Sequence, residues 1–397
     1  MQFFRTWSPQ HDASAIDVTG GEGHMICLAD GTALYDAISC NFQASFGYSA
    51  QPIIHAIQSQ LLRMPVANPK HDHTLKTQVS QRLCDLVTSD PGRIFYTVSG
   101  AEAIENALKM ARQVTGRERI VARTRSYHGA TMGAMSVTGD WRGQGHFGVQ
   151  SATIRIPEPA DDPDAEQAHA IIRAVGPESI AACCFETISG MNGVIIPPHS
   201  WWQRIAAICR TYGILLIVDE VSCGFGRTGT AFAMHHYGIH PDFVCMAKAI
   251  TGGYIPFGAV WVNEAVASWY DTRMLSAGLT AYAHPLGLAA CNAVLDILHS
   301  PAFQQHLTTT STVFATGIAT LATHPRVQHT RQIGMMAAVD LAPDDFIRWE
   351  DGVRHGLHLA VKANTVVLAP PLTSTPDECT DILQRLTALL DEGVPRE

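Results

Sequence analysis

Residues 213–220 read Gly-Ile-Leu-Leu-Ile-Val-Asp-Glu, an apolar run that ends in two carboxylates. A strand that is apolar at every position is typical of a sheet buried on both faces, and hence of mostly parallel α/β folds. Charges at the end of such a strand cost free energy unless they are paired or functional. A second apolar run, Phe243–Met246, is followed by Lys248 and then by Thr251-Gly252-Gly253. Both runs indicate the carboxyl edge of a sheet, where open α/β sheets bind their ligands.

The segments around these runs predict a large α/β domain, because strand-like and helical patterns alternate between about residues 92 and 262. The sheet is expected to be mostly parallel and covered by helices on both faces. Helices are predicted over Ala101–Val114 and Trp201–Tyr212. The predicted strands are Ile94–Val98, Arg119–Arg123, Ala181–Phe185, Ile214–Val218, Phe243–Met246 and Gly258–Val262.

The two ends of the chain predict a smaller α+β domain. We expect residues 1–50 to form an N-terminal arm or part of that domain, residues 51–290 the large domain, and residues 291–397 the rest of the small domain. Near the N-terminus, an Asp30-Gly31 turn between two short apolar runs is a hairpin signal. The elements predicted are strands Met25–Leu28, Ala33–Asp36, Met335–Leu341 and Thr365–Leu368, and helices Pro285–Leu298, Pro301–Thr323 and Pro376–Leu390.

Composition excludes several classes of function. The net charge of the 397 residues is -9 and no basic run reaches five residues, which argues against nucleic acid and anionic membranes as partners. No apolar stretch approaches the roughly 18 residues that cross a bilayer. Met1–Gln10 lacks the features of a signal peptide, and the ten scattered cysteines are expected to be reduced, so we expect a cytoplasmic protein. His71-Asp72-His73 and His235-His236 lack metal-ligand spacing, so no metal site is predicted.

Lys248 and Asp219 are the residues whose positions suggest chemistry. Lys248 is one of five lysines, and only this one follows a buried strand. Burial lowers the pKa of a lysine and makes its amine nucleophilic toward a carbonyl. Asp219 suits a pyridinium nitrogen, which needs a carboxylate partner to stay protonated. A capped strand end is the alternative for Asp219.

Two loops suggest a binding site. Ser99-Gly100-Ala101 joins a strand to a helix, and small residues there let backbone N–H groups approach a phosphate at the positive end of the helix. Glu102, in the first turn, would suit that helix end equally well. Tyr127, in Tyr127-His128-Gly129, follows another strand and could stack on a planar ring, with an ordinary core aromatic as the alternative.

The order and spacing of these pieces resemble the class III aminotransferases. These are fold type I pyridoxal-phosphate enzymes, and they include the ornithine, 4-aminobutyrate, diaminopelargonate and ω-amine transaminases. The resemblance covers most of the chain and is carried by Leu215–Val221, Gly224–Gly229, Pro241-Asp242, Lys248–Pro256, Ser99–Ala103, Ala107–Arg112, Tyr127–Gly129, Glu186 with Gly190 and Gly193, Pro197-Pro198, Thr280 before His284-Pro285, and Pro370–Leu372.

The resemblance implies a seven-stranded sheet, pyridoxal 5'-phosphate as cofactor, and transfer of an amino group from a primary (ω-) amine or amino acid to a carbonyl acceptor. It implies a ping-pong aldimine/ketimine mechanism, in which Lys248 forms the Schiff base and moves the proton while Asp219 pairs with the pyridinium. It also implies a homodimer with shared sites, in which Thr280 reaches the phosphate of the neighbouring subunit. The other cofactor contacts implied are Ser99, Gly100, Ala101, Tyr127, His128, Glu186, Val221 and Ser222.

The sequence departs from the family pattern at three positions. Ala101 stands where many relatives have Ser, and Ser222 where many have Gln or Ile. Ala360 stands where many carry an Arg that grips a substrate α-carboxylate. Lys362 or Arg273 could substitute for that Arg, the substrates could be bound differently from α-amino acids, or the count could slip by one or two residues.

Two other functions remain open on the sequence alone. A family relative could keep the cofactor and act as a racemase, aminomutase, decarboxylase or phospholyase, although the intact Gly224–Gly229 run is more typical of the transaminases. A non-catalytic binding protein could retain the fold, although the presence of both Lys248 and Asp219 argues against it.

Overall fold

The structure is a computed structural model that describes residues 2–11, 15–146, 148–149, 151–343 and 345–392. Its centre is a seven-stranded sheet in the order β4-β10-β9-β8-β7-β5-β6. The four neighbouring pairs from β9 to β6 are parallel, and only β10 runs antiparallel to both of its neighbours. The strands are β4 (Gly92–Thr97), β5 (Arg119–Arg123), β6 (Thr153–Ile156), β7 (Ile180–Glu186), β8 (Leu215–Asp219), β9 (Phe243–Met246) and β10 (Gly258–Asn263).

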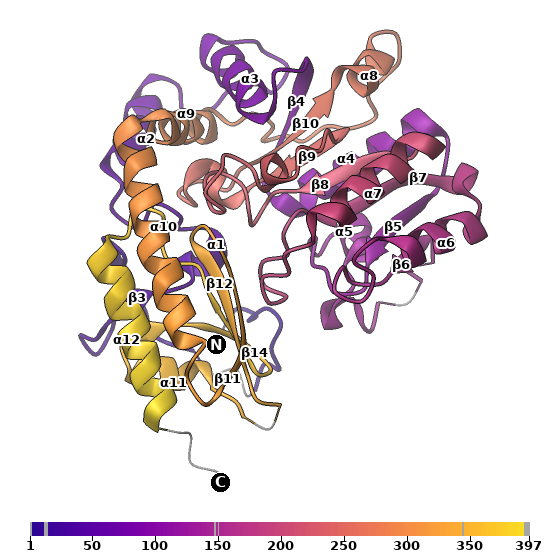
Figure 1. The fold of residues 1–397 in the computed structure, drawn as a ribbon. Coiled ribbons are helices and arrows are strands. Elements are labelled where there is room, and N and C mark those ends of the chain that lie inside the picture. The colour runs from indigo at the N-terminus through magenta and orange to yellow at the C-terminus, as the bar shows by residue number, and fades with distance from the viewer. Residues whose placement is uncertain (1, 12–14, 147, 150, 344, 393–397) are drawn as a thin grey trace.

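Helices cover both faces of this sheet, as Figure 1 shows. Side chains alternate along each strand, so that Phe185 of β7 enters the core beneath α7 (His199–Tyr212) and Cys184 enters the core beneath α4 (Gly100–Thr115). The predicted α/β fold, a mostly parallel sheet sandwiched by helices, is therefore confirmed. The other helices of this part are α2 (Gln51–Arg63), α3 (Thr74–Val87), α5 (Met132–Val137), α6 (Glu166–Val175), α8 (Glu264–Ala267) and α9 (Pro285–His299).

A second part combines both ends of the chain. β3 (Ala33–Asp36) pairs in parallel with β13 (Leu357–His358), which joins the N-terminal hairpin to the C-terminal region. This pairing supports the expectation that both ends build one small domain, whose bounds stay a prediction. Strands β11, β12, β15 and β14 form a second small sheet in that order. Figure 1 shows α10 and α12 side by side, and α10 packs against β11 of this sheet. The remaining elements are β1 (Val18–Glu22), β2 (Met25–Leu28), α1 (Ser39–Phe42), α10 (Pro301–Leu321), β11 (Val327–Ile333), β12 (Met336–Leu341), α11 (Trp349–Arg354), β14 (Ala360–Lys362), β15 (Thr365–Leu368) and α12 (Pro376–Glu392).

The predicted strands of the large sheet lie where expected to within two residues, and β6 is the one that was missed. Its sequence, Thr-Ile-Arg-Ile, is only four residues long and lies at the sheet edge. In the small part, β1, β11, β13 and β14 were also missed, because β1 and β11 are largely polar and β13 and β14 have two and three residues. The helix predicted over Pro301–Thr323 ends at Leu321.

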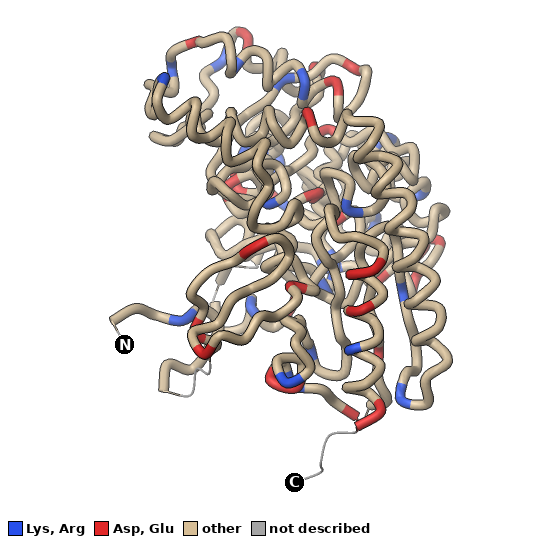
Figure 2. The backbone as a smooth tube through the Cα atoms, turned by 90° about the vertical axis from the view of Figure 1, so that its left-hand side faces the viewer, with Lys and Arg blue, Asp and Glu red and all other residues tan. Residues whose placement is uncertain are grey.

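The charged residues, the apolar helices and the cysteines bear on the predicted partners and location. Figure 2 shows acidic and basic residues interspersed along the backbone. Within the described ranges, no single helix is long and apolar enough to cross a membrane. The bent pair α9 and α10, at 71°, passes that test of length and composition when its two helices are taken together. All ten cysteines are free.

Candidate active site

The carboxyl edge of the large sheet holds a cavity of about 540 Å³. The five parallel strands β9, β8, β7, β5 and β6 all end at this edge, and so does β4, because β10 reverses direction between β4 and β9. Ten of the eleven predicted site residues line the cavity, and Thr280 is the exception. The ten are Ser99, Gly100, Ala101, Tyr127, His128, Glu186, Asp219, Val221, Ser222 and Lys248.

Lys248 lies at the floor of this cavity, two residues after β9 ends. Its backbone has a φ of 49°, a left-handed conformation that costs a non-glycine residue on the order of 1–3 kcal/mol. Its Nζ donates a hydrogen bond of 2.7 Å to Ser222 Oγ and lies 5.4 Å from the centre of the Phe42 ring. Burial lowers the pKa of Lys248, and the charges of Asp219 and Glu186 oppose that shift only in part. The amine is therefore more available as a nucleophile than an ordinary surface lysine.

Asp219, at the end of β8, is held by two hydrogen bonds. Its Oδ1 accepts from the backbone N–H of Val221 at 2.9 Å, and its Oδ2 lies 2.8 Å from His128 Nδ1. An ionised carboxylate can only accept, so Nδ1 carries the proton in this pair. The Asp219 side chain is 5% exposed and that of His128 is fully buried. These two partners fix the orientation of the carboxylate, which stays shielded from water.

A cradle for an anion lies at the start of α4. Ser99 caps the helix by accepting a hydrogen bond from the Glu102 backbone N–H at 3.2 Å, and the Glu102 carboxylate accepts one from the Val98 N–H at 2.9 Å. In the part of the chain that the structure describes, the N–H groups of Gly100 and Ala101 have no protein acceptor. A Cβ at Gly100 would lie 3.0 Å from the Val221 side chain, so a glycine keeps this approach open. Free N–H groups at a helix start favour a phosphate.

Tyr127 and Glu186 meet on the β5 side of the cavity. Glu186 Oε1 accepts hydrogen bonds from the Tyr127 backbone N–H at 3.1 Å and from Ser189 Oγ at 2.9 Å. Burial raises the pKa of the Glu186 carboxyl group. Gly129 has a φ of 134°, and a Cβ there would lie 2.5 Å from Ala101 Cβ. This glycine lets the Tyr127 loop pack directly on the cradle.

Several residues that the sequence did not single out also line the cavity. Thr6 and Trp7 come from the N-terminal segment, which therefore reaches the large-domain site as well as the small domain. Asn41 belongs to a run from Ser39 to Phe42 in which every residue has a positive φ, and Arg142 follows α5. No periodicity or motif marks such loop positions, so only the folded structure could identify them.

The glycine-rich run 224–229 holds the site together through Arg227. Its buried guanidinium donates to Pro370 O at 2.5 Å, to Met335 O at 2.8 Å and to Ser45 Oγ at 3.2 Å. Burial lowers the pKa of Arg227 to about 9. These bonds join the large sheet to the C-terminal region beside the cavity.

Four residues considered in the sequence analysis, Thr280, Ala360, Arg273 and Lys362, do not line the cavity. Thr280 is exposed in a turn and does not line the cavity of its own chain. Ala360 in β14 does not line it, and Arg273 stacks on Trp269 at 4.7 Å. Lys362 Nζ donates a hydrogen bond to Asn192 and lies 3.7 Å from Asp140 Oδ2. Lys362 does not line the cavity, but Asp140 also pairs with Arg142, which does.

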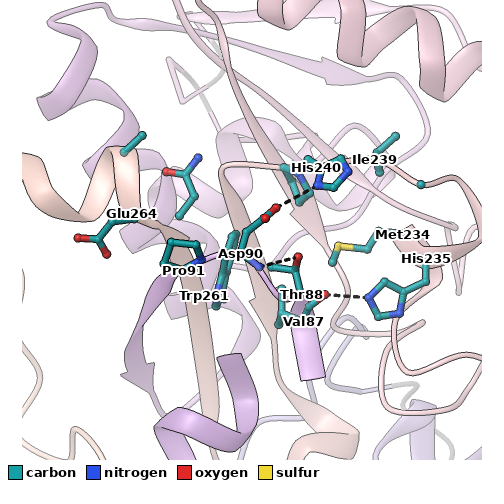
Figure 3. A pocket seen from close by; sticks show the side chains of 14 residues that line it. Val87, Thr88, Asp90, Pro91, Met234, His235, Ile239, His240, Trp261 and Glu264 are labelled. Atoms are coloured by element: carbon teal, nitrogen blue, oxygen red, sulfur yellow. Dashed lines mark hydrogen bonds and ion pairs between the residues drawn. The ribbon is translucent and has the colours of Figure 1, made fainter. Parts of the chain in front are cut away.

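A second cavity, of about 430 Å³, opens at the opposite edge of the sheet. Figure 3 shows His240 pointing toward Asp90 and His235 toward the backbone of Val87, at distances of 3.3 and 2.8 Å. No lysine is among the described residues that line it, and the side chains of Asp90 and His240 are largely exposed.

The carboxyl-edge cavity fits a planar cofactor that carries an aldehyde and a phosphate. Lys248 offers an amine, Asp219 a buried carboxylate for a ring nitrogen, and the start of α4 two unpaired N–H groups for a phosphate. His128 Nε2 is buried without a partner, which leaves a donor or acceptor free at this site. Within the described residues, no group of histidine, cysteine and acidic side chains could hold a metal ion.

Comparison with known sequences gives a consistent result. The class III aminotransferase family profile matches residues 6–390. The chain is 30% identical over 420 residues to a diaminobutyrate–2-oxoglutarate transaminase of Halomonas elongata, which covers 94% of this chain and 90% of the relative. It is 33% identical over 409 residues to an adenosylmethionine-8-amino-7-oxononanoate aminotransferase of Synechococcus elongatus, which covers 95% of each chain.

Solved structures are equally similar. An amine transaminase from an uncultivated Pseudomonas species, in its pyridoxal-phosphate-bound form, superimposes with a TM-score of 0.93 at 28% identity and covers 99% of both chains. A taurine:2-oxoglutarate aminotransferase of Bifidobacterium kashiwanohense, bound to pyridoxal phosphate and glutamate, gives a TM-score of 0.92 at 28% identity, with 98% of this chain and 95% of that chain covered.

Proposed function

This chain belongs to the class III pyridoxal-phosphate-dependent aminotransferases, and we propose that Lys248 and Asp219 carry its reaction in the carboxyl-edge cavity. The observation that supports these roles is the convergence of a buried lysine amine, a buried carboxylate and a helix-start cradle on one cavity. The enzyme moves an amino group from an amine donor to a carbonyl acceptor. The cofactor supplies an aldehyde carbon that takes up amines and a ring that accepts electrons from the substrate.

Lys248 has two tasks in this proposal. Its neutral amine, favoured by the lowered pKa, binds the cofactor. Once free of the cofactor, its Nζ would stand as the base for the substrate Cα proton and would hold that proton at the cavity floor. Ser222 Oγ, 2.7 Å away, accepts a hydrogen bond from Nζ and holds it at the cavity floor.

Asp219 and His128 have the task of fixing charge. The Asp219 carboxylate would hold the ring nitrogen of the cofactor in its protonated form, and His128 holds that carboxylate in place through the contact at Nδ1. The N–H groups of Gly100 and Ala101 bind the phosphate, with Ser99 beside them. We assign Val221 and Tyr127 to the two faces of the ring, and Glu186 to its edge.

We further propose that the enzyme is a homodimer with composite sites. Thr280 is exposed on its own chain and lies outside the cavity, as a residue that serves a neighbour would. Leu62 and Met274 are 88% and 85% exposed, and apolar side chains of this kind are commonly buried at subunit interfaces. A cytoplasmic location is also proposed, supported by ten free cysteines.

A subunit-mixing experiment tests the composite site. A Lys248→Ala chain is mixed with a Thr280→Ala chain under conditions that exchange subunits. If the sites are shared, each mixed dimer contains one site with both lesions and one with neither. We expect the mixture to gain activity at limiting cofactor, with wild-type cofactor affinity at the intact site.

The controls separate this result from simple addition. Lys248→Ala alone is expected to be inactive, and Thr280→Ala alone to bind the cofactor about tenfold more weakly because a hydroxyl bond to phosphate is lost. Thr309→Ala, an exposed threonine of α10, is the matched variant that leaves affinity unchanged. A mixture with no more activity than the sum of its parents, or a fully active monomer, contradicts the composite site.

A further inference from the structure

An arginine surrounded by aromatic rings faces the proposed reaction site. The Arg142 guanidinium carbon lies 4.4 Å from the Tyr127 ring centre, 5.3 Å from that of Trp141 and 5.7 Å from that of Trp7. The Trp7 ring also contacts the other two edge to face, with its centre 6.3 Å from that of Tyr127 and 5.8 Å from that of Trp141. Rings at these distances attract a cation and restrict its motion. The Arg142 side chain, 15% exposed, lines the same cavity as Lys248.

Two further cations, Lys362 and Arg125, lie near Arg142. Asp140 Oδ2 lies 2.6 Å from Arg142 Nη1 and 3.7 Å from Lys362 Nζ, so one carboxylate serves two cations. Arg125 donates to the backbone carbonyl of Asn192 at 2.9 Å and adds a third positive charge nearby. Burial lowers the pKa of Lys362; the charges of Asp140 and Glu186 oppose that shift, and the positive charges of Arg142 and Arg125 add to it. The cavity as a whole is lined by two cations, Arg142 and Lys248, and by two carboxylates, Glu186 and Asp219. Because Arg142 shares the Asp140 carboxylate with Lys362, its guanidinium can attract a further anionic group.

Among the described residues that line the cavity, no other side chain offers a guanidinium for a substrate carboxylate. Position 360 holds an alanine in β14, and Arg273 stacks on Trp269 without lining the cavity. Arg142 is near enough to Lys248 for its positive charge to help lower the pKa of the lysine. Arg142 is the one arginine among the described residues that line the cavity.

We propose that Arg142 binds the carboxylate of the substrate, with Tyr127, Trp141 and Trp7 holding its guanidinium in place. This inference rests on the proposed function of the cavity and adds the class of substrate: a carboxylate-bearing carbonyl acceptor or amino acid. The planar guanidinium can hold a carboxylate through two parallel hydrogen bonds. Asp140 is the resident partner of Arg142, and the substrate carboxylate takes a place on the guanidinium beside it or instead of it.

The same arrangement explains how one cavity could serve both half-reactions. An amine without a carboxylate leaves Arg142 paired with Asp140, so no buried charge is left alone. A carboxylate-bearing substrate uses Arg142 in addition. Specificity for an acid over its neutral analogue therefore comes from Arg142, whereas the amine chemistry comes from Lys248.

A binding test with unreactive probes isolates this role. Calorimetric titration of the holoenzyme compares butanoate with butanamide, which matches it in shape and lacks the charge. We expect the wild type to bind butanoate at least tenfold more tightly than butanamide. Arg142→Gln should remove that preference, and Arg142→Lys, which keeps the charge and loses the planar fork, should retain part of it.

Kinetics provide the second measurement. With pyruvate as acceptor, Arg142→Gln should raise KM by roughly 10- to 100-fold, the value of one or two charged hydrogen bonds, with a much smaller change in kcat. The first half-reaction with 1-aminobutane, which has no carboxylate, should stay within threefold of wild type. Arg210→Gln, an exposed arginine in the last turn of α7, is the matched control.

Each result decides the question. The proposal is overturned if the wild type shows no preference for butanoate, if Arg142→Gln keeps the preference, or if Lys362→Gln removes it while Arg142→Gln does not. An equal loss with 1-aminobutane and pyruvate would likewise overturn it. Failure of the proposed roles of Lys248 and Asp219 would be seen separately, as turnover that survives their substitution, and would leave the butanoate titration unchanged.

Discussion

The two edges of the large sheet each carry a cavity, and they hold their ionisable groups in opposite ways. At the amino edge, Asp90 and His240 lie 3.3 Å apart with side chains 59% and 73% exposed. At the carboxyl edge, Asp219 and His128 lie 2.8 Å apart with side chains 5% and 0% exposed. The first pair keeps its water and contributes little to stability. The second pair is removed from water, and this desolvation costs free energy. A fold does not need a buried ion pair to be stable, so a functional reason for this pair is expected.

This difference identifies the functional cavity more reliably than size does. The two cavities have volumes of about 430 and 540 Å³, so both could admit a small molecule. Only the carboxyl-edge cavity combines a buried carboxylate with a lysine whose pKa is lowered by burial. Ionisable groups kept in such surroundings are characteristic of sites where proton transfer or charge stabilisation takes place.

The largest effect is expected from removing the amine at the carboxyl edge. Lys248→Ala should reduce turnover by about 10⁴-fold or more, because both the cofactor bond and the proton transfer depend on it. Steady-state rates and borohydride reduction followed by mass analysis measure the two roles. Lys109→Ala, an exposed lysine of α4, is the matched control and should retain full activity. A covalent adduct that still forms on the Lys248→Ala protein, together with retained turnover, would identify another lysine.

The next largest effect is expected from the same chemical change made at each edge. Asp219→Asn should lower kcat by roughly 10³-fold, on the order of 4 kcal/mol, because an amide cannot keep the ring nitrogen protonated. Asp90→Asn should change kcat by less than twofold, since its partner His240 remains solvated. Rapid-mixing measurement of the donor half-reaction compares them. Equal effects from the two substitutions would remove the distinction between the edges.

A smaller effect is expected in stability, from the buried carboxylate next to Asp219. Glu220 accepts hydrogen bonds from Thr187 Oγ1, Ala233 N and Met234 N, yet burial raises its pKa from 4.5 to about 7. The native state therefore holds a proton that the unfolded chain loses between pH 4.5 and 7. The free energy of unfolding should fall by roughly 3 kcal/mol across that window as pH rises.

Glu220→Gln should remove this part of the pH dependence. Urea unfolding at several pH values between 4.5 and 7 gives the slope for each protein. The raised pKa of Glu186 contributes in the same direction in both proteins, so the difference between them isolates Glu220. Parallel pH profiles would show that the folded-state pKa of Glu220 is ordinary.

Much of this site could be predicted because its residues follow buried strands. Asp219 and Lys248 come directly after apolar runs, and the carboxyl ends of parallel strands meet at one edge. The resemblance to class III aminotransferases was confirmed by the comparisons, as were the cofactor and the class of reaction. The partner Thr280 stays a prediction, because its role depends on a second chain.

The remainder depends on contacts that leave no pattern in the sequence. Trp7, Tyr127 and Trp141 come from separate loops and meet only around Arg142. The residues from Ser39 to Phe42 have positive φ angles, but none of them is a glycine, so the sequence does not indicate this conformation. Tertiary contacts, such as the bond from Arg227 to Ser45 Oγ, hold these segments where local preference would not.

The parallel pairing of β3 with β13 has a consequence for how the protein is made. Ser39 Oγ donates to Ala369 O across 330 residues of sequence. At typical rates of synthesis, the N-terminal hairpin leaves the ribosome roughly 20 to 60 s before the segment it binds. During that interval the outer edge of β3 has unpaired backbone groups, which other strands can bind. The order of translation thus leaves the beginning of the chain exposed to misassembly until its end has been synthesised.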